Sequence, residues 1–349
     1  MSPSSLAESV ATASCPSRVS TPAPSDLRVV ALGGGTGLPT VLRGLRACLF
    51  DARPWDADRD QARLTAIATV ADDGGSSGLL RAAYEVPSPG DIRNCLVALA
   101  GSDPAMSELF DFRFARKGEV AGHSLGNLIL TALTELERDF SRAVRRAAGM
   151  LAIRGRVLPS TTRSVVLSAE LSDGTVIEGE SRIAGAQSPV RRLRLEPSDA
   201  AALPEAVDAL ERADLIVIGP GSLYSSLVAV LLVHGLPEAI ARSRARVVLV
   251  MNLMTEPGET DGHTGADHIM AIRRHAPTIP IHDVLISTTP LEPAQIARYA
   301  SLNATPVRAD VQLLRALGHA VVESDLLAAG ADVRHDPEKL GRALIERVS

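Results

Sequence analysis

Five short apolar runs, each followed by a glycine-rich or polar loop, constrain the fold of this chain most strongly. The runs are 27–32, 64–70, 214–219, 246–253 and 283–288. Segments with apolar residues at helical spacing separate them, and such alternation is typical of a mostly parallel sheet with helices on both faces. We therefore expect an α/β fold with a Rossmann-like doubly wound sheet, whose ligands bind beyond the carboxyl ends of the strands.

Helices and an antiparallel insert complete the expected organisation. The expected helices are 38–50, 90–101, 123–140, 204–213, 223–233, 266–275, 292–301 and 337–348. Residues 155–181 instead alternate with a period of two and contain an "SDG" turn, which predicts a small antiparallel β insert at about 155–197. We expect a single domain over 27–349, preceded by a disordered tail at 1–26 that is rich in Ser, Ala, Pro and Thr.

Charge and composition exclude several classes of function. Lys and Arg number 36 against 41 Asp and Glu, and aromatic residues make up 3% of the chain, which argues against a nucleic-acid partner. No apolar run reaches the roughly 18 residues of a membrane span. The three Cys residues have no metal-site or disulfide spacing. Because the N-terminus also lacks the basic and apolar regions of a secretory signal, we expect a cytoplasmic bacterial protein.

The first loop, "GGGTG", has the composition of a phosphate-binding loop. Glycines let backbone N–H groups approach an anion at the N-terminus of the following helix. Leu38 stands where the dinucleotide fingerprint needs a glycine, and no lysine follows as it would in a Walker A loop. We expect ligand contacts here, with a tight strand-to-helix turn as the alternative. The candidate residues are Gly33, Gly34, Gly35, Thr36 and Gly37.

The second loop, "ADDGGSSG", carries two adjacent carboxylates. In a dinucleotide fold an acid at the end of the second strand accepts hydrogen bonds from ribose hydroxyls, which is one role for Asp72 and Asp73. Paired carboxylates could instead hold Mg²⁺, and a local Asx-type turn is the structural alternative. Ser76 and Ser77 extend a loop with little side-chain bulk, so we expect a ligand role for all four residues.

Four further stretches place polar side chains at predicted helix starts or strand ends. "SPGDIRN" contains an aspartate that could be merely a helix cap, and "GHSLGN" lacks the preceding buried strand of a hydrolase nucleophile elbow. "GPGSLYSS" supplies a second glycine loop, and "MNLMTEPGET" follows another strand. The candidate ligand-binding residues are Asp91, Asn94, His123, Ser124, Asn127, Gly219, Gly221, Ser222 and Asn252.

Seven motifs in order resemble the YvcK-like branch of the CofD-like (UPF0052) family, the gluconeogenesis factors. They are "GGGTGLPTVLRGLR", "TVADDGGSSGLLR", "SPGDIRNCLVALA", "GHSLGNLILTAL", "GPGSLYSSL", "NLMTEPGET" and "RHDPEKL". The resemblance runs from about residue 28 to 348. Ser88 departs from the proline that the family commonly has at this position.

The resemblance implies a ligand and a cellular role. Members of this branch bind UDP-N-acetylglucosamine and act in cell shape and envelope precursor supply during growth on gluconeogenic carbon sources. A Tyr and an Arg near the C-terminus contact the UDP-sugar, and the matching positions are Tyr299 and Arg334. The other branch contains the 2-phospho-L-lactate transferases, which use Mg²⁺ and carboxylates equivalent to the Asp72–Asp73 loop.

We therefore expect a UDP-sugar-binding regulator with no catalytic residues and no required cofactor. The alternative is a Mg²⁺-dependent 2-phospho-L-lactate transferase-type enzyme acting on a nucleotide-activated phosphoester. A weaker third reading is an NAD(P)-binding dehydrogenase, disfavoured by the broken fingerprint, although NAD(P) binding itself fits such a fold. The expected partners are the nucleotide ligand, a regulatory protein and a second copy of the chain, with no nucleic acid and no membrane span.

Overall fold

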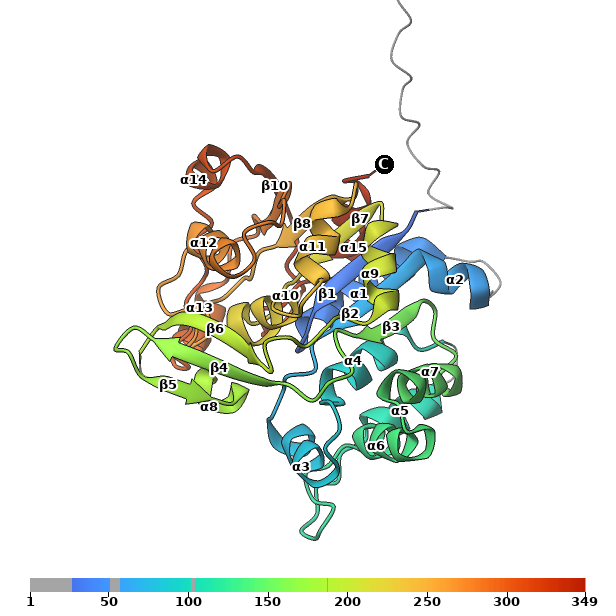
Figure 1. Cartoon of the computed structure of the whole chain (residues 1–349). Helices are drawn as coiled ribbons and strands as arrows, with labels where there is room; N and C mark the ends of the chain where they lie inside the picture. Colours follow the sequence, from blue (N-terminus) through green and yellow to red (C-terminus); the bar gives the residue numbers. More distant parts are fainter. Residues whose placement is uncertain (1–26, 51–56, 102–103, 187, 349) are drawn as a thin grey trace, which may run out of the picture.

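The computed structural model describes residues 27–50, 57–101, 104–186 and 188–348. The tail expected at 1–26 lies outside the described residues. A seven-stranded sheet runs through the centre of the molecule, and all its neighbouring strands are parallel (Figure 1). Its strands are β1 (Val29–Gly33), β2 (Leu64–Ala68), β3 (Arg156–Pro159), β7 (Leu215–Ile218), β8 (Arg246–Val250), β9 (Asp283–Ser287) and β10 (Ala320–Ser324). The expected Rossmann-like α/β fold is confirmed.

The strand order reverses between β1 and β7. Along the sheet the order is β10-β9-β8-β7-β1-β2-β3, so the chain builds outward from β1 in one direction and then, from β7, in the other. Every residue of β1, β2 and β7 is buried, because helices cover both faces of a parallel sheet. The loops that follow β1 and β7 therefore diverge at the edge where such sheets bind ligands.

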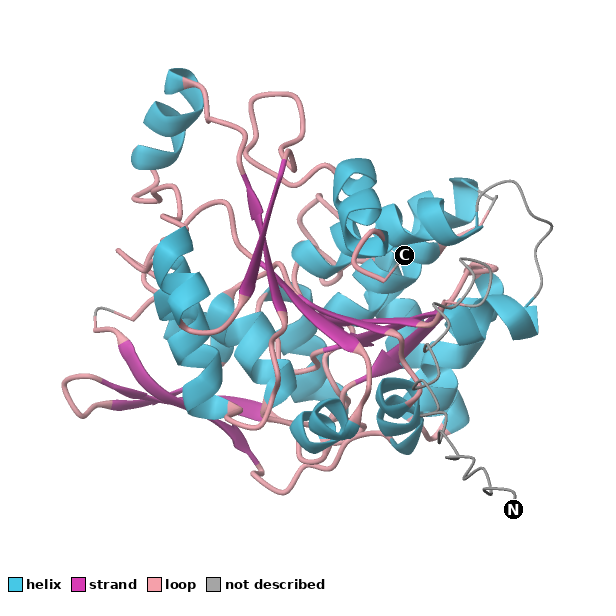
Figure 2. Ribbon diagram, turned by 90° about the horizontal axis from the view of Figure 1, so that it is seen from above, coloured by secondary structure: helices cyan, strands magenta, loops and turns pink. Residues whose placement is uncertain are grey.

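Helices flank the sheet, as Figure 2 shows from above. They are α1 (Gly37–Phe50), α2 (Ala57–Arg63), α3 (Gly75–Tyr84), α4 (Gly90–Leu99), α5 (Pro104–Asp111), α6 (Leu125–Glu137), α7 (Phe140–Met150), α8 (Glu180–Ala184), α9 (Pro204–Glu211), α10 (Ala229–Leu231), α11 (Leu236–Arg242), α12 (Gly265–His275), α13 (Pro293–Ala300), α14 (Val311–Ala316) and α15 (Pro337–Ile345), with a π-helix, η1, at Leu223–Val228. In the described part of the chain no helix is long and apolar enough to cross a bilayer.

Helix α15 packs on α1 through two glycines. A Cβ atom on Gly44 would lie 2.0 Å from the carbonyl oxygen of Pro337, and one on Gly341 would lie 2.5 Å from the carbonyl oxygen of Gly44. Since side chains cannot fit between them, the two helix backbones are in direct contact. This contact brings the segment before α15 beside the start of α1, and both segments line the cleft described below.

The antiparallel sheet is smaller than expected. Its strands β4 (Val166–Leu171), β5 (Val176–Glu178) and β6 (Val190–Glu196) are ordered β5-β4-β6 and stand to one side of the parallel sheet in both views (Figures 1 and 2). The expected start of the insert at 155 was wrong, because Arg156–Pro159 pairs in parallel with β2 and belongs to the main sheet. A four-residue strand is too short for period-two alternation to distinguish the two sheets.

Several expected helices differ in detail. The helix expected at 123–140 ends at Glu137, because Arg138 adopts a left-handed conformation (φ 53°). A separate helix, α7, begins at Phe140. The serines expected in a loop after the acidic pair begin α3 instead. The helix expected at 223–233 is split into η1 and α10. Strand β10 was missed because its alternation is short and its residues are only partly buried.

Candidate functional site

A cleft of ≈ 720 Å³ opens where the strand order reverses. Its walls come from the loops after β1, β7 and β8, from the start of α1, and from the segments around α13 and before α15. This place agrees with the rule for ligand sites in open α/β sheets. Seven of the residues predicted from sequence line it: Thr36, Gly37, Asn94, Gly221, Asn252, Tyr299 and Arg334.

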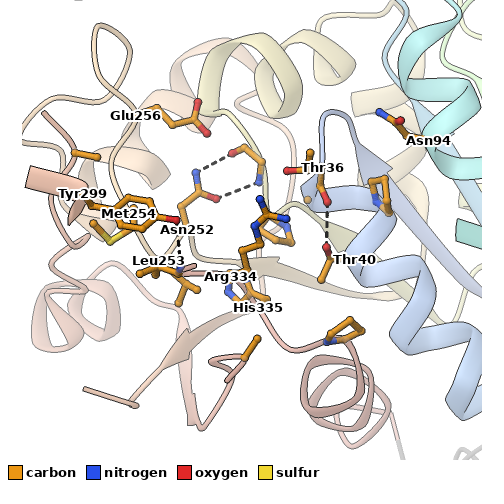
Figure 3. A pocket seen from close by; sticks show the side chains of 18 of the residues that line it. Thr36, Thr40, Asn94, Asn252, Leu253, Met254, Glu256, Tyr299, Arg334 and His335 are labelled. Atoms are coloured by element: carbon orange, nitrogen blue, oxygen red, sulfur yellow. Dashed lines mark hydrogen bonds between the residues drawn. The ribbon is translucent and has the colours of Figure 1, made fainter. Parts of the chain in front are cut away.

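The floor of the cleft is backbone, because two glycine loops touch there. A Cβ atom on Gly37 would lie 2.0 Å from the carbonyl oxygen of Pro220, so no side chain is tolerated. The side-chain amide of Asn252 fixes the second loop, since its Oδ1 accepts from the Gly221 N–H (3.1 Å) and its Nδ2 donates to the Gly221 carbonyl (2.8 Å; Figure 3). The expected tight turn is therefore present, and the same backbone forms part of the cleft surface.

Tyr299 and Arg334 occupy the C-terminal wall and belong to one unit. The Tyr299 hydroxyl accepts a hydrogen bond from the Val333 N–H at 3.1 Å, which ties α13 to the residue before Arg334. The Arg334 side chain is 72% exposed, and among the described residues its charged contact is a long one with Asp332, at 3.7 Å. In Figure 3 it lies between Asn252 on one side and Thr36 and Thr40 on the other. Its guanidinium is thus available to a ligand in the cleft.

Arg43 is a second cation of the cleft, and sequence reasoning missed it. It lines the cleft from α1 and donates to the Thr40 hydroxyl at 3.3 Å. Burial lowers the pKa of this guanidinium, Asp111 opposes that shift, and Arg334 adds to it. Positions 36, 40 and 43 share one face of a helix, so the spacing Thr-x-x-x-Thr-x-x-Arg after the glycine loop was the available signal.

His335 also lines the cleft and was not predicted. It is 8% exposed, and its Nε2 is buried without a hydrogen-bond partner among the described residues. Burial lowers its pKa to about 4, against a smaller opposing effect of the Met251 backbone. The imidazole is therefore neutral at neutral pH and supplies bulk, not charge.

Asp91 lies behind the first glycine loop. Its Oδ1 accepts from the Gly35 N–H at 2.9 Å, and its Oδ2 would be 2.4 Å from a Cβ on Gly34. The carboxyl is buried, and burial raises its pKa to about 7, with the Gly35 hydrogen bond opposing and the charges of Asp72 and Glu180 adding to the rise. Asp91 therefore supports the loop and is half protonated near neutral pH.

A separate group of polar side chains, outside the cleft lining, consists of Ser76, His123 and Asn127. The Ser76 hydroxyl lies 3.0 Å from His123 Nδ1 and accepts from Asn127 Nδ2 at 3.2 Å. The Oδ1 of Asn127 is buried without a hydrogen-bond partner among the described residues. The structure thus brings together these three predicted residues, but none of them lines the cleft.

Comparison with known proteins decides the family. The family described as "2-phospho-L-lactate transferase CofD" matches residues 29–327. The chain belongs to the CofD family. The gluconeogenesis factor of Halalkalibacterium halodurans is 43% identical over 319 residues, covering 91% of this chain and 95% of the relative. The gluconeogenesis factor of Bacillus subtilis is 41% identical over 320 residues, covering 91% and 97%.

Solved structures agree with this assignment of the CofD-family chain. A crystal structure of a UPF0052-family protein from Bacillus halodurans has a TM-score of 0.85 and 42% sequence identity, covering 91% of this chain and 99% of that one. The similarity therefore extends over the parallel sheet and the small antiparallel sheet together. The resemblance inferred from the seven motifs is confirmed.

The paired carboxylates of this CofD-family chain hold the backbone. Asp72 Oδ1 accepts from the Gly74 N–H at 2.8 Å, which is the Asx-type turn. Asp73 Oδ1 accepts from both the N–H (2.8 Å) and the hydroxyl (2.7 Å) of Ser181, which anchors the insert at α8. The described residues contain no group of three or more His, Cys, Asp or Glu suited to a metal ion. Mg²⁺ commonly uses only one or two carboxylates together with substrate phosphates, so Mg²⁺ binding by this pair stays a prediction.

The remaining predicted residues lie around these two groups. Gly33 ends β1, Gly219 follows β7, and Ser222 stands at the start of η1 without a side-chain cap bond. Ser77 is buried within α3 near Gly90. Ser124 is fully buried, donates to the Phe110 carbonyl at 3.2 Å and accepts from Arg93, so its role is packing of α6.

Proposed function

We propose that this CofD-family chain is a gluconeogenesis factor that binds UDP-N-acetylglucosamine in the cleft and acts as a regulator. The observation that carries the proposal is the meeting of two arginines and a tyrosine above two glycine loops at the reversal of strand order. The relatives named gluconeogenesis factor match nearly the full length of this chain. A cleft of ≈ 720 Å³ is within the roughly 300–1,000 Å³ of small-molecule sites.

Each wall suits a different part of a nucleoside-diphosphate sugar. The guanidinium groups of Arg43 and Arg334 repel each other across the cleft, and a pyrophosphate would relieve that repulsion while accepting their hydrogen bonds. The N-terminus of α1, which begins at Gly37 in the wall of the cleft, favours the same anion. Tyr299 offers an aromatic face to a uracil or a sugar. The proposed ligand therefore uses both the charge and the shape of the cleft.

Isothermal titration calorimetry with UDP-N-acetylglucosamine tests the proposal. We expect saturable binding by the full chain and a loss of about tenfold or more in affinity for Tyr299→Ala and for Arg334→Ala. Arg212→Ala is the matched control, because Arg212 is exposed, pairs with Asp208 on α9 and is not part of the cleft lining. Absence of binding by the full chain, or equal binding by all three variants, would refute the proposal.

The regulatory role extends this proposal to partners and place. We propose a cytoplasmic protein that reports UDP-N-acetylglucosamine to a protein partner and supports cell shape and envelope precursor supply on gluconeogenic carbon sources. A second copy of the chain remains an expected partner, and NAD(P) a candidate ligand of the same cleft. A deletion strain that keeps normal shape on such carbon sources would contradict the cellular part.

One group of residues favours a second candidate function, a Mg²⁺-dependent phosphoester transferase. Ser76, His123 and Asn127 lie in hydrogen-bond contact, and the charges of Asp72 and Asp91 interact nearby. Buried polar clusters with a shifted carboxyl pKa are common at catalytic sites. The deciding assay is Mg²⁺-dependent turnover of nucleotide-diphospho-phospholactate that persists after dialysis and is lost in Asp72→Asn. Lack of turnover would count against a transferase and leave UDP-sugar binding untouched.

A further inference from the structure

A second, smaller cavity of ≈ 230 Å³ lies where the insert meets the main domain. Strand β6 forms one side, the C-terminal end of α12 another, and Leu232, just after α10, a third. None of the residues lining it belongs to the nucleotide cleft. The lining residues are Arg192, Leu193, Arg194, Leu195, Ser198, Leu232, Arg274 and His275.

Three arginines converge on this cavity and no acid lines it. Arg192 and Arg194 are two residues apart on β6, so their side chains leave the same face of the strand. Within the described chain neither guanidinium makes a hydrogen bond or an ion pair. Arg274 donates only to the Arg191 carbonyl, at 3.3 Å, which leaves most of its five N–H donors free. The chain carries a net charge of −5, so the positive charge of this cavity is opposite in sign to the net charge of the protein.

The carboxylate that faces Arg192 on the neighbouring strand is already engaged. Glu170 faces Arg192 across the β4–β6 pair, but its Oε1 lies 3.0 Å from the guanidinium of Arg191 instead. Burial lowers the pKa of the His275 imidazole, and the positive charges of Arg274 and Arg192 lower it further. Both arginines therefore act on the same imidazole, which also lines the cavity.

The frame of the cavity is fixed by hydrogen bonds from both sides. His275 Nε2 accepts from the Leu193 N–H at 2.9 Å, while its Nδ1 lies 2.8 Å from the Ala271 carbonyl. The Tyr224 hydroxyl donates to the Val190 carbonyl at 3.3 Å, and the Tyr224 and His275 rings meet edge to face with centroids 6.0 Å apart. The arginines thus stand on a braced strand, which limits the ordering entropy that a bound ligand would cost.

We propose that this arginine pocket, formed by Arg192, Arg194 and Arg274, binds the phosphoryl group of a small phosphate monoester. Guanidinium groups match the oxygens of a phosphate dianion with paired, charge-assisted hydrogen bonds. Three cations match the double negative charge of a phosphate dianion better than they match the single charge of a carboxylate ligand. The half-buried Leu232 gives apolar contact to the carbon body of such a ligand, and the small volume of the cavity excludes a nucleotide-sized one.

Isothermal titration calorimetry of the full chain, which detects phosphate-bearing and neutral probes alike, tests the pocket. The starting protein carries Arg334→Ala, which removes a phosphate-binding cation of the nucleotide cleft. Into it we introduce R192Q with R194Q, or R274Q alone, and as matched control R212Q, another exposed arginine that lies outside the pocket. The probes are inorganic phosphate, a hexose 6-phosphate and the neutral hexose. Because these arginines are exposed or partly exposed, thermal unfolding of each variant checks that the fold is kept.

The expected result is saturable binding of both phosphate probes, weakened about tenfold or more by R192Q with R194Q and by R274Q but not by R212Q. Tighter binding of the hexose 6-phosphate than of phosphate identifies a phosphorylated metabolite as the ligand, and equal binding identifies free phosphate. No binding up to about 10 mM, binding unchanged in the pocket variants, or equal binding of the neutral hexose overturns the proposal.

Discussion

The side-chain amide of Asn252 grips the backbone of Gly221 with two hydrogen bonds, accepting from its N–H at 3.1 Å and donating to its carbonyl at 2.8 Å. Asn252 follows β8 and Gly221 follows β7, so one side chain joins the loops of neighbouring strands. Only an amide provides a donor and an acceptor in this arrangement. This pair of hydrogen bonds between Asn252 and Gly221, called the clasp below, sets the position of the glycine loop that forms the floor of the nucleotide cleft.

Replacing the amide by a carboxylate should open this clasp. In Asn252→Asp an oxygen would face the Gly221 carbonyl, which leaves two acceptors in contact and costs about 1–3 kcal/mol. We expect the affinity for UDP-N-acetylglucosamine to fall by about tenfold or more, with a modest loss of thermal stability. Calorimetry and thermal unfolding measure the two effects. Unchanged affinity would show that the clasp has no part in the binding site.

Arg43 should contribute to binding although no motif identified it. We expect Arg43→Gln to weaken UDP-N-acetylglucosamine by about five- to tenfold, since one charge-assisted hydrogen bond is lost. Uridine, which has no phosphate, should show no difference between Arg43→Gln and the unsubstituted chain. Arg212→Gln serves as control. An equal effect on uridine and on the UDP-sugar would mean that Arg43 acts through packing of α1 and not through charge.

The parallel sheet could be predicted from sequence because each buried strand is a continuous apolar run followed by a glycine or polar loop. "LRVVAL" covers all of β1 but its last residue, Gly33, "DLIVIG" contains β7, and their loops meet at the cleft. Strand β3 was placed in the insert because four residues carry no periodic signal, and only pairing with β2 assigns it. Strand order likewise arises from contacts distant in sequence.

The candidate ligand-binding residues were predicted as one set. In the structure some of them line the cleft, and others, such as Ser76, His123 and Asn127, form a separate group. Glycine loops, Asn252, Tyr299 and Arg334 do meet, because they follow strands or flank helices at one edge of the sheet. Asp73 was expected to face a ligand, which stays a prediction, and its Oδ1 also holds Ser181 of the insert, 108 residues away. Sequence shows that a carboxylate follows a strand, whereas its partner depends on how the insert folds back.

Binding of the nucleotide should depend on pH through Asp91. Its pKa is raised to about 7, so the carboxyl is neutral below that pH and negative above it. An anionic ligand near the Gly35 loop is therefore opposed only at the higher pH. We expect the dissociation constant to rise by about three- to tenfold between about pH 6 and pH 8. Calorimetry at several pH values measures this change.

Asp91→Asn isolates the cause of that dependence. The amide oxygen still accepts from the Gly35 N–H but carries no charge at any pH, so the affinity should be nearly constant over the same range. Asp199→Asn is the control, because Asp199 is exposed and pairs with Arg163 far from the loop. If the pH dependence persists in Asp91→Asn, another group is responsible.

Acid stability should depend on His335. Burial lowers its folded-state pKa to about 4, below the ordinary value of 6.5. As the pH falls below 6.5, the unfolded chain takes up a proton that the folded chain accepts only near pH 4, so folding is progressively disfavoured through that window. The loss amounts to about 2–3 kcal/mol by about pH 4.5. In His335→Gln the free energy of unfolding in urea should fall by that much less between about pH 7 and pH 4.5, whereas the exposed-site control His234→Gln should keep the full decrease. An unaltered slope in His335→Gln would place the acid sensitivity elsewhere in the fold.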